Sequence, residues 1–211
     1  ASRIAAEQVP LIYEKNAPRS PPLALKRGLE QANTEIHTRG RQQPEYLGMG
    51  TTCTTLAILP RGALVCHVGD SRAYRLRGNR LDQLTRDHSA VWELEAQGGL
   101  SREQAERVVG KNVITRSMGP HPRVEVDLEG PIPVEAGDVF LLCSDGLSGQ
   151  VADEEIGLFI RELPPRAACA ALVGLTLVRG APDNVTAIVA RTGAEEASVS
   201  AAGEPPWRLD D

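Results

Sequence analysis

Three aspartates stand at the ends of apolar segments that are predicted to be strands. Asp70 closes the run ALVCHVGD, Asp145 closes DVFLLCSD, and Asp183 opens DNVTAIV. A carboxylate at the end of a buried strand is costly unless it is hydrogen-bonded or holds a cation. If the three strand ends meet, their oxygen atoms suit a hard divalent ion such as Mg²⁺ or Mn²⁺. Each aspartate taken alone is equally compatible with an ordinary turn, because Asp-Gly and Asp-Asn pairs favour turns.

The other reactive side chains lack a recognised catalytic context. The four histidines, which show no spacing typical of metal ligands, are His37, His67, His88 and His121. Ser71 and Ser144 each adjoin one of the aspartates, but neither lies in a G-x-S-x-G nucleophile elbow. No cysteine is followed by an arginine in a glycine-rich loop, and no G-x-x-x-x-G-K phosphate loop is present. We therefore predict no catalytic residue beyond the metal ligands.

The aspartates need strands to carry them, and the apolar pattern predicts several. The predicted strands are residues 51–59, 63–68, 73–77, 80–84, 138–143 and 185–190, with shorter extended segments at 112–116 and 124–128. Residues 60–62 and 78–79 have turn composition, so the first four strands form two successive hairpins and predict an antiparallel sheet. Residues 138–143 are apolar almost throughout, which suits a strand buried on both faces.

Helical segments precede, interrupt and follow these strands. The predicted helices are residues 1–9, about 25–40, 89–109, 153–162 and about 164–178. Pro10 and the polar residues up to Pro22 are expected to break the first helix, and Asp153 is expected to cap the fourth. Because strands and helices come in runs rather than in strict βαβ units, the sequence predicts a layered α+β domain.

The composition is that of one globular domain. The 211 residues are 41% hydrophobic and 24% charged, and they are numerous enough to bury a sizeable core. The formal net charge is -5 without a basic stripe, which argues against a nucleic-acid partner. No apolar run approaches the roughly 20 residues that a membrane span needs.

The positions of the cysteines bear on the cellular compartment of the protein. Each lies in an apolar stretch, and none has the short pairwise spacing of a zinc site; they are Cys53, Cys66, Cys143 and Cys169. Buried free thiols are common in reducing compartments, so we expect a cytoplasmic protein. The alternative is a secreted domain in which the same four residues form two disulfides.

Six short motifs, taken in order, resemble those of the type 2C family of metal-dependent serine/threonine protein phosphatases. They are GMGTT at 48–52, VGDSRAY at 68–74, LTRDHS at 84–89, ITRSMG at 114–119, LCSDGLS at 142–148 and DNVTAIV at 183–189. Each motif alone is weak, but six in family order are a specific signal. The residues of these motifs are most similar to those of the bacterial members.

This resemblance implies an α/β/β/α sandwich of four layers, in which helices flank two antiparallel sheets and two metal ions lie in a cleft at one end. It assigns Asp145 and Asp183 to one of these Mn²⁺ or Mg²⁺ ions and Asp70 to a third, weaker ion. Some members have a carboxylate four residues after the SDG aspartate. Gly149 stands there in this sequence, which puts the third ion in doubt. Residues of about 89–112 resemble the mobile flap beside the cleft.

The activity that the resemblance implies is hydrolysis of phosphoserine and phosphothreonine in proteins. The attacking group is a metal-activated water in a binuclear site, and no covalent phospho-enzyme is needed. The expected partners are phosphorylated proteins and a serine/threonine kinase, as in signal transduction. The alternative is a catalytically inactive module that binds phosphoproteins. We expect residues 1–192 to form the phosphatase domain and 193–211 a flexible tail or linker.

The sequence departs from the family pattern at its start. The pattern has an early arginine and acidic pair, then a strand ending in Asp-Gly-Met-Gly-Gly, whose aspartate bridges the two main ions. The present sequence opens with ASRIAAEQV, which resembles the helix after that motif. A missing strand would leave unpaired backbone groups, each costing about 1–3 kcal/mol. We therefore expect either that another chain fills the gap or that upstream residues exist.

Overall fold

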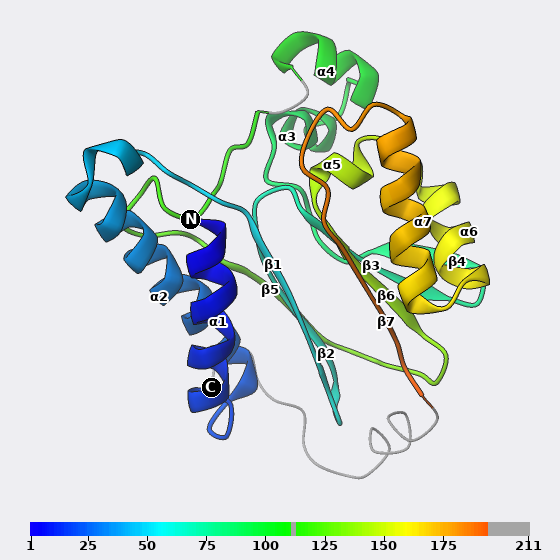
Figure 1. The fold of residues 1–211 in the computed structure, drawn as a ribbon, viewed down its shortest axis with the longest axis horizontal. Helices are drawn as coiled ribbons and strands as arrows, with labels where there is room; N and C mark the ends of the chain where they lie inside the picture. Colours follow the sequence, from blue (N-terminus) through cyan, green and yellow to red (C-terminus); the bar gives the residue numbers. More distant parts are fainter. Residues whose placement is uncertain (111–112, 194–211) are drawn as a thin grey trace.

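The computed structural model describes residues 1–110 and 113–193 of the chain. Its strands form two antiparallel sheets (Figure 1). The first sheet has the order β1 (Cys53–Leu59), β2 (Gly62–Val68) and β5 (Asp127–Ile132). The second has the order β4 (Arg80–Gln83), β3 (Arg72–Arg77), β6 (Val139–Cys143) and β7 (Ala187–Arg191). Both predicted hairpins are confirmed, because β1 pairs with β2 and β3 pairs with β4.

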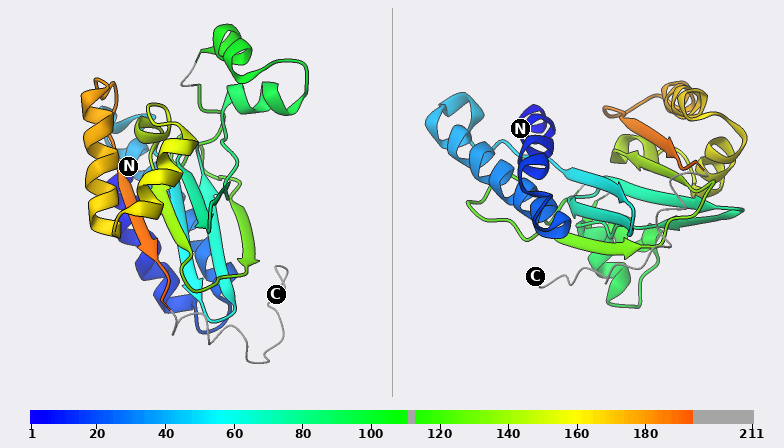
Figure 2. Two further views of the ribbon diagram at one scale, coloured as in Figure 1. Left: turned by 90° about the vertical axis from the view of Figure 1, so that its right-hand side faces the viewer. Right: turned by 90° about the horizontal axis from the view of Figure 1, so that it is seen from below.

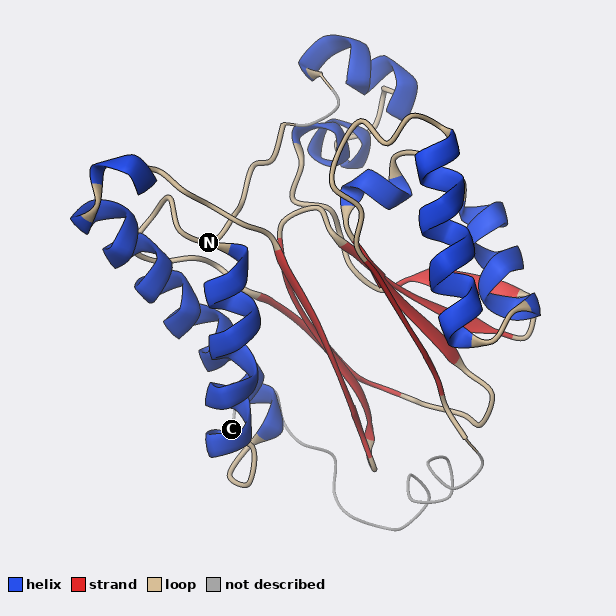
Figure 3. Ribbon diagram, in the orientation of Figure 1, coloured by secondary structure: helices blue, strands red, loops and turns tan. Residues whose placement is uncertain are grey.

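Helices cover the outer face of each sheet (Figures 2 and 3). Those beside the first sheet are α1 (Ser2–Asn16) and α2 (Pro21–Gln42), followed by the short η1 (Pro44–Tyr46). Those beside the second sheet are α5 (Asp145–Ser148), α6 (Asp153–Glu162) and α7 (Pro165–Val178). Two more, α3 (Ala90–Ala96) and α4 (Arg102–Val109), project from one end. The predicted α+β class and four-layer sandwich are confirmed.

Three apolar clusters hold the layers together. One joins α1 and α2 to the first sheet and includes Leu29 and Leu64. The second lies between the sheets, where Phe140 is buried. The third joins the second sheet to its helices and includes Leu141 and Ile156. The run that contains β6 was predicted to be buried on both faces, and Phe140 and Leu141 face different clusters as a central strand requires.

The predicted helix break at Pro10 is wrong. Helix α1 continues through this proline to Asn16, and Pro10 lies on the exposed side. A proline inside a helix removes one hydrogen bond and costs about 3 kcal/mol. The opposite side of α1 buries Ala5 and Val9, and Gly28 lets α2 approach Val9 closely. Packing between the two helices therefore outweighs the local preference of proline.

Smaller differences concern boundaries. The extended segment predicted at 112–116 contributes only an isolated bridge between Ser89 and Ile114 among the described residues. The strand expected at 124–128 begins at Asp127, and the last strand begins at Ala187. Asp153 is the first helical residue of α6, while Ala152 takes the cap position. The hydrophobic pattern of a short segment predicts the type of element but not the residues at which it begins and ends.

Strands β1 and β7 each lie at one edge of a sheet. Ile58 on β1 and Ile188 on β7 are partly exposed there. The expectation that another chain or upstream residues cover such an edge is not tested by a single chain and stays a prediction. The predicted tail, apart from Gly193, lies outside the described residues.

None of the four cysteines forms a disulfide in the structure. Burial raises the pKa of the Cys66 thiol to about 12 and that of Cys53 to about 11. The disulfide alternative is therefore not supported, and the cytoplasmic location stays a prediction. Among the described residues, no helix is both long enough and apolar enough to cross a membrane.

Candidate active site

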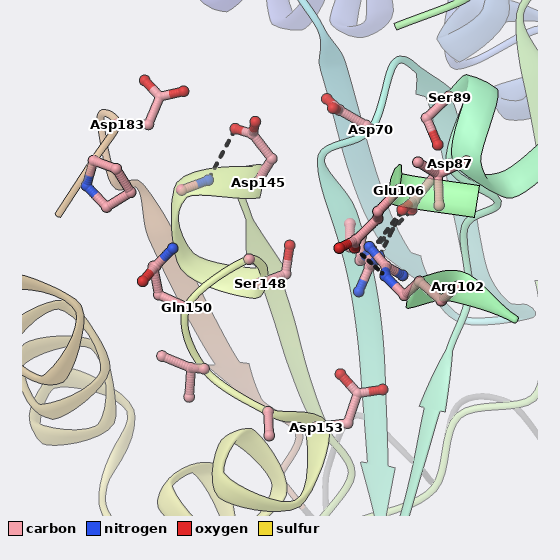
Figure 4. Close-up of a pocket in the computed structure, with 17 residues that line it drawn as sticks. Asp70, Asp87, Ser89, Arg102, Glu106, Asp145, Ser148, Gln150, Asp153 and Asp183 are labelled. Carbon is pink, nitrogen blue, oxygen red and sulfur yellow. Dashed lines mark hydrogen bonds and ion pairs between the residues drawn. The ribbon is translucent and has the colours of Figure 1, made fainter. Parts of the chain in front are cut away.

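The three predicted aspartates line one cleft of about 500 Å³ at the end of the sandwich. Figure 4 shows Asp145 and Asp183 on one wall and Asp70 on the opposite wall. Three further carboxylates, Asp87, Glu106 and Asp153, line the same cleft. The chain folds so that β2, β6 and β7 each place one end here, which brings together residues that are far apart in the sequence.

Asp145 begins helix α5 directly after β6. One of its carboxylate oxygens accepts the backbone N–H of Gly146 at 2.9 Å. Burial and the nearby carboxylate of Asp183 raise the pKa of Asp145. Gly146 is required at the next position, because a Cβ there would overlap the carbonyl oxygen of Asn184. This close approach brings the Asp183 loop against the start of α5.

Ser144 links the start of α5 to the loop that carries Asp183. Its hydroxyl donates to the carbonyl oxygen of Asn184 at 3.2 Å and accepts the N–H of Thr186 at 3.0 Å. Its backbone N–H donates to the carbonyl oxygen of Thr186 at 3.1 Å. Asp183 itself is exposed, and its carboxylate accepts the N–H of Asn184 at 2.7 Å. Both carboxylates of this wall are therefore oriented by a bond to the following residue.

On the opposite wall, Asp70 follows a tight turn after β2. Gly69 has a φ of +116°, and a Cβ there would overlap the side chain of Thr52. Only glycine fits this position. Asp70 is 9% exposed, and burial together with repulsion from Asp145 raises its pKa to about 6. The nearby charge of Arg72 opposes this rise in the pKa but does not cancel it.

A buried ion pair stands beside Asp70. Arg72 donates through Nε and Nη2 to the carboxylate of Asp87 at 2.9 and 2.6 Å, and both side chains are about 5% exposed. Arg72 also donates to the hydroxyl of Tyr74, which donates in turn to Asp153 at 3.1 Å. The charge of Asp87 is thus neutralised, unlike that of Asp70.

The helices α3 and α4 overhang the cleft. Arg102 and Glu106 of α4 line it and form an ion pair of 3.3 Å. The two ends of this segment are held side by side: Ala90 N–H donates to Val113 O, and Thr115 N–H donates to His88 O, both at 2.9 Å. The segment predicted as a flap therefore enters and leaves the domain at one place, although residues 111–112 lie outside the described part.

The oxygen donors of the cleft fit a divalent cation. Among the described residues, no three His, Cys, Asp or Glu side chains converge closely enough to form a metal site. The three aspartates line one cleft, and the assignment of Asp145 and Asp183 to one ion and of Asp70 to another stays a prediction. Repulsion links Asp145 to both Asp183 and Asp70, so negative charge is concentrated here. Mg²⁺ is usually bound by one or two carboxylates and several waters, which this arrangement allows.

Sequence reasoning missed three carboxylates of the cleft, Asp87, Glu106 and Asp153, and it also missed Ser144, which links the two segments of the first wall. Ser144 and Asp87 lie within the quoted motifs LCSDGLS and LTRDHS, so the motifs themselves held the signal. Asp153 was interpreted as a helix cap, and its place in the cleft follows from the packing of α6. Gly149 lines the cleft as well, and it supplies no carboxylate there.

Comparisons with known proteins identify the family of this chain. The model of the protein phosphatase 2C family matches residues 1–175. Protein phosphatase PhpP of Streptococcus pneumoniae is 39% identical over 170 residues, which are 80% of this chain and 68% of that protein.

Solved structures show the same fold. PppA, described as a key regulatory component of T6SS in Pseudomonas aeruginosa, has a TM-score of 0.77 and 35% identity over 89% of this chain and 77% of its own. The catalytic domain of the serine/threonine protein phosphatase PstP, solved with two manganese ions, has a TM-score of 0.75 and 30% identity. That match covers 90% of this chain and 80% of the other.

Proposed function

Because the chain belongs to the protein phosphatase 2C family, we propose that it hydrolyses phosphoserine and phosphothreonine in proteins through a metal-activated water in a binuclear site. Enzymes of this family are serine/threonine phosphatases that depend on Mn²⁺ or Mg²⁺. The observation that carries the proposal is that aspartates from three separate motifs line one cleft. We take residues 1–192 as the phosphatase domain, with a flap of about 89–112.

We assign Asp145 and Asp183 to one ion and Asp70 to a further, weaker one. When bound, the ions activate a water for in-line attack on phosphorus and neutralise the developing charge. Asp145 and Asp183 each use one carboxylate oxygen to accept a backbone N–H. Within the part of the chain that the structure describes, the second oxygen of each is available to a cation. The backbone bonds fix the direction of these oxygens before a cation arrives.

The substrates that we propose are phosphorylated proteins, with a serine/threonine kinase as the opposing enzyme. The cleft lies at one end of the sandwich, between strand ends and the overhanging α4, where a segment of another protein can reach it. The free cysteines support a cytoplasmic location.

An inactive phosphoprotein-binding module is the second candidate. The charge of the cleft disfavours it, because Asp70, Asp145 and Asp183 repel a phosphate dianion unless cations lie between them. A module that only bound phosphate would be expected to present arginine or lysine at this place. Arg72 is already paired with Asp87 in the cleft wall.

The test is hydrolysis of p-nitrophenyl phosphate by the full-length gene product, with the 211-residue chain beside it, in the presence of Mn²⁺, with EDTA and with Mn²⁺ added back. We expect turnover that disappears with EDTA and returns with the metal. Binding of Mn²⁺ is measured separately by titration calorimetry. Phosphopeptide binding without turnover, at a metal concentration that saturates the protein, would instead establish the binding module.

A further inference from the structure

We propose that His88 is a positioning residue that holds the Gly69–Asp70 turn in the shape required for cation binding by Asp70. His88 lies in the motif LTRDHS at the base of α3, next to Ser89 on the Asp70 wall of Figure 4. The inference rests on the proposed function, because it assumes that Asp70 binds a cation. No role was assigned to His88 from its spacing or from the cleft.

His88 contacts both backbone groups of Gly69. The N–H of His88 donates to the carbonyl oxygen of Gly69 at 2.7 Å. The N–H of Gly69 donates to Nδ1 of His88 at 2.9 Å. Both residues are buried, so neither bond has water as a ready substitute. One side chain and its own backbone thus fix the peptide units that lead into Asp70.

The tautomer of His88 follows from these bonds. Since Nδ1 accepts a hydrogen bond, the proton of the neutral ring is on Nε2. Nε2–H donates to Oδ2 of Asp127 at 3.0 Å, and Oδ1 of Asp127 accepts from Arg116 at 2.6 Å. Arg116 also lies 3.0 Å from Nε2, but two donors cannot bond each other, so Asp127 serves both. The first sheet thereby orients the ring.

A second histidine packs against this ring. The ring centroids of His67 and His88 are 4.8 Å apart with an interplanar angle of 31°. His67 is held by Thr54 Oγ1 at 2.8 Å and by the carbonyl oxygen of Arg86 at 3.1 Å. His88 is therefore fixed at both ring nitrogens and on one face. Because both ring nitrogens already have partners, His88 is placed to orient the turn before Asp70 and not to bind a cation itself.

Two substitutions separate a positioning role from a packing role. In His88→Asn, the amide oxygen lies near the former Nδ1 and still accepts the Gly69 N–H, while the bond to Asp127 is lost. In His88→Gln, the amide reaches the former Nε2 and still donates to Asp127, but the Gly69 N–H loses its acceptor. Both variants remove the imidazole, so a packing role predicts similar damage from each.

The experiment is Mn²⁺ titration calorimetry on the full chain, with Asp70→Asn identifying the binding event that depends on Asp70. We expect His88→Gln to weaken that event by about tenfold or more, and His88→Asn to keep most of its affinity. Amide hydrogen exchange of Gly69 is the second readout, and it should accelerate in His88→Gln only. His121→Gln, an exposed histidine, is the control and should change neither quantity.

Equal weakening by both variants, or none by His88→Gln, would overturn the inference and leave the proposed function standing. A wild-type chain that binds no Mn²⁺ would overturn both. If His88→Gln does not fold, Asp127→Asn takes its place, since it removes the charge that orients Nε2–H. We then expect Mn²⁺ binding to weaken and Gly69 exchange to accelerate in that variant. Unchanged values would overturn the inference.

Discussion

The two walls of the cleft hold their carboxylates by different means. On the wall of β6 and β7, Asp145 and Asp183 accept bonds from the residues that follow them, and Ser144 ties the two segments together. On the side of β2 and β3, the carboxylates of Asp87 and Asp127 are instead held by side chains that are distant in the sequence. Arg72 and Asp87 are 15 residues apart, and His88 and Asp127 are 39 apart.

Because of this difference, substitutions on the two walls should have different effects on metal binding and on folding. The first wall leaves its charges available, so substitutions there should affect metal binding and turnover more than folding. The second wall neutralises Asp87 with Arg72 and buries the histidines, so substitutions there should affect folding first. Asp70 is the exception on the second wall, because its carboxylate is buried with a raised pKa.

The largest effect is expected on the first wall. Asp145→Asn and Asp183→Asn should each lower Mn²⁺-dependent hydrolysis by the full chain more than about 100-fold, because each removes a charged oxygen ligand. Asp70→Asn should have a smaller effect. Turnover of p-nitrophenyl phosphate is the measurement, with melting temperature as the control for folding. Wild-type turnover in either of the first two variants would remove that residue from the site.

The second prediction concerns the buried ion pair of the opposite wall. Arg72→Met leaves the Asp87 carboxylate buried without its partner and should lower the free energy of unfolding by about 3–5 kcal/mol. Chemical denaturation followed by circular dichroism measures it. The control is Arg107→Ala, which removes an exposed ion pair with Glu103 on α4 and should cost about 0.5 kcal/mol or less. Similar losses in the two variants would show that the buried pair contributes no special stability.

The third prediction concerns pH. Burial and the neighbouring His88 lower the pKa of His67 to about 4 from 6.5, against the opposing charges of Asp127 and Asp87. Between these pH values the unfolded chain binds a proton that the folded chain does not. Stability should therefore fall as the pH falls from 6.5 towards 4, by up to about 3 kcal/mol from this residue.

Denaturation curves across this pH range test the contribution of His67. The variant His67→Gln lacks the titrating group, so its stability should depend less steeply on pH than that of the wild type. His121→Gln provides the comparison, since the exposed His121 should leave the slope unchanged. A slope that survives unaltered in His67→Gln would place the acid sensitivity elsewhere.

The smallest effect is expected from glycine substitutions. Gly146→Ala places a methyl group against the carbonyl oxygen of Asn184 and should destabilise the chain by about 1–3 kcal/mol, with a loss of turnover because the Asp183 loop must move. Gly174→Ala, in the open interior of α7, should stabilise by about 0.5–1 kcal/mol. Thermal melting and hydrolysis are measured for both. Normal turnover in Gly146→Ala would show that the two segments need not touch.

More residues of the first wall than of the second could be predicted from the sequence. Asp145 and Asp183 were predictable because each lies in a short motif at the end of an apolar run, and Asp70 was predictable on the same grounds. The pairing of Arg72 with Asp87 was not, because it depends on how the chain returns after β4. The course of α1 through Pro10 was missed for the same reason, since packing on α2 decides it.

The spacing of the aspartates was beyond the reach of the sequence as well. A motif states that a carboxylate ends a strand, but the twist and packing of two sheets decide how far apart three strand ends lie. The arrangement of the three aspartates around one cleft follows from those long-range contacts.

The paired ends of the α3–α4 segment have a consequence for how the molecule can be altered. Ser89 and Ile114 form a β-bridge, and the N–H of Thr115 donates to the carbonyl oxygen of His88. The two ends of this insertion are therefore held together where it leaves the domain. Lengthening a surface loop whose ends are already joined adds little entropy cost. Segments of other lengths and sequences can therefore be grafted between Ser89 and Ile114 without changing the spacing of the strands below. The α3–α4 segment is an exchangeable part, whereas Asp70, Asp145 and Asp183 belong to the sandwich below it.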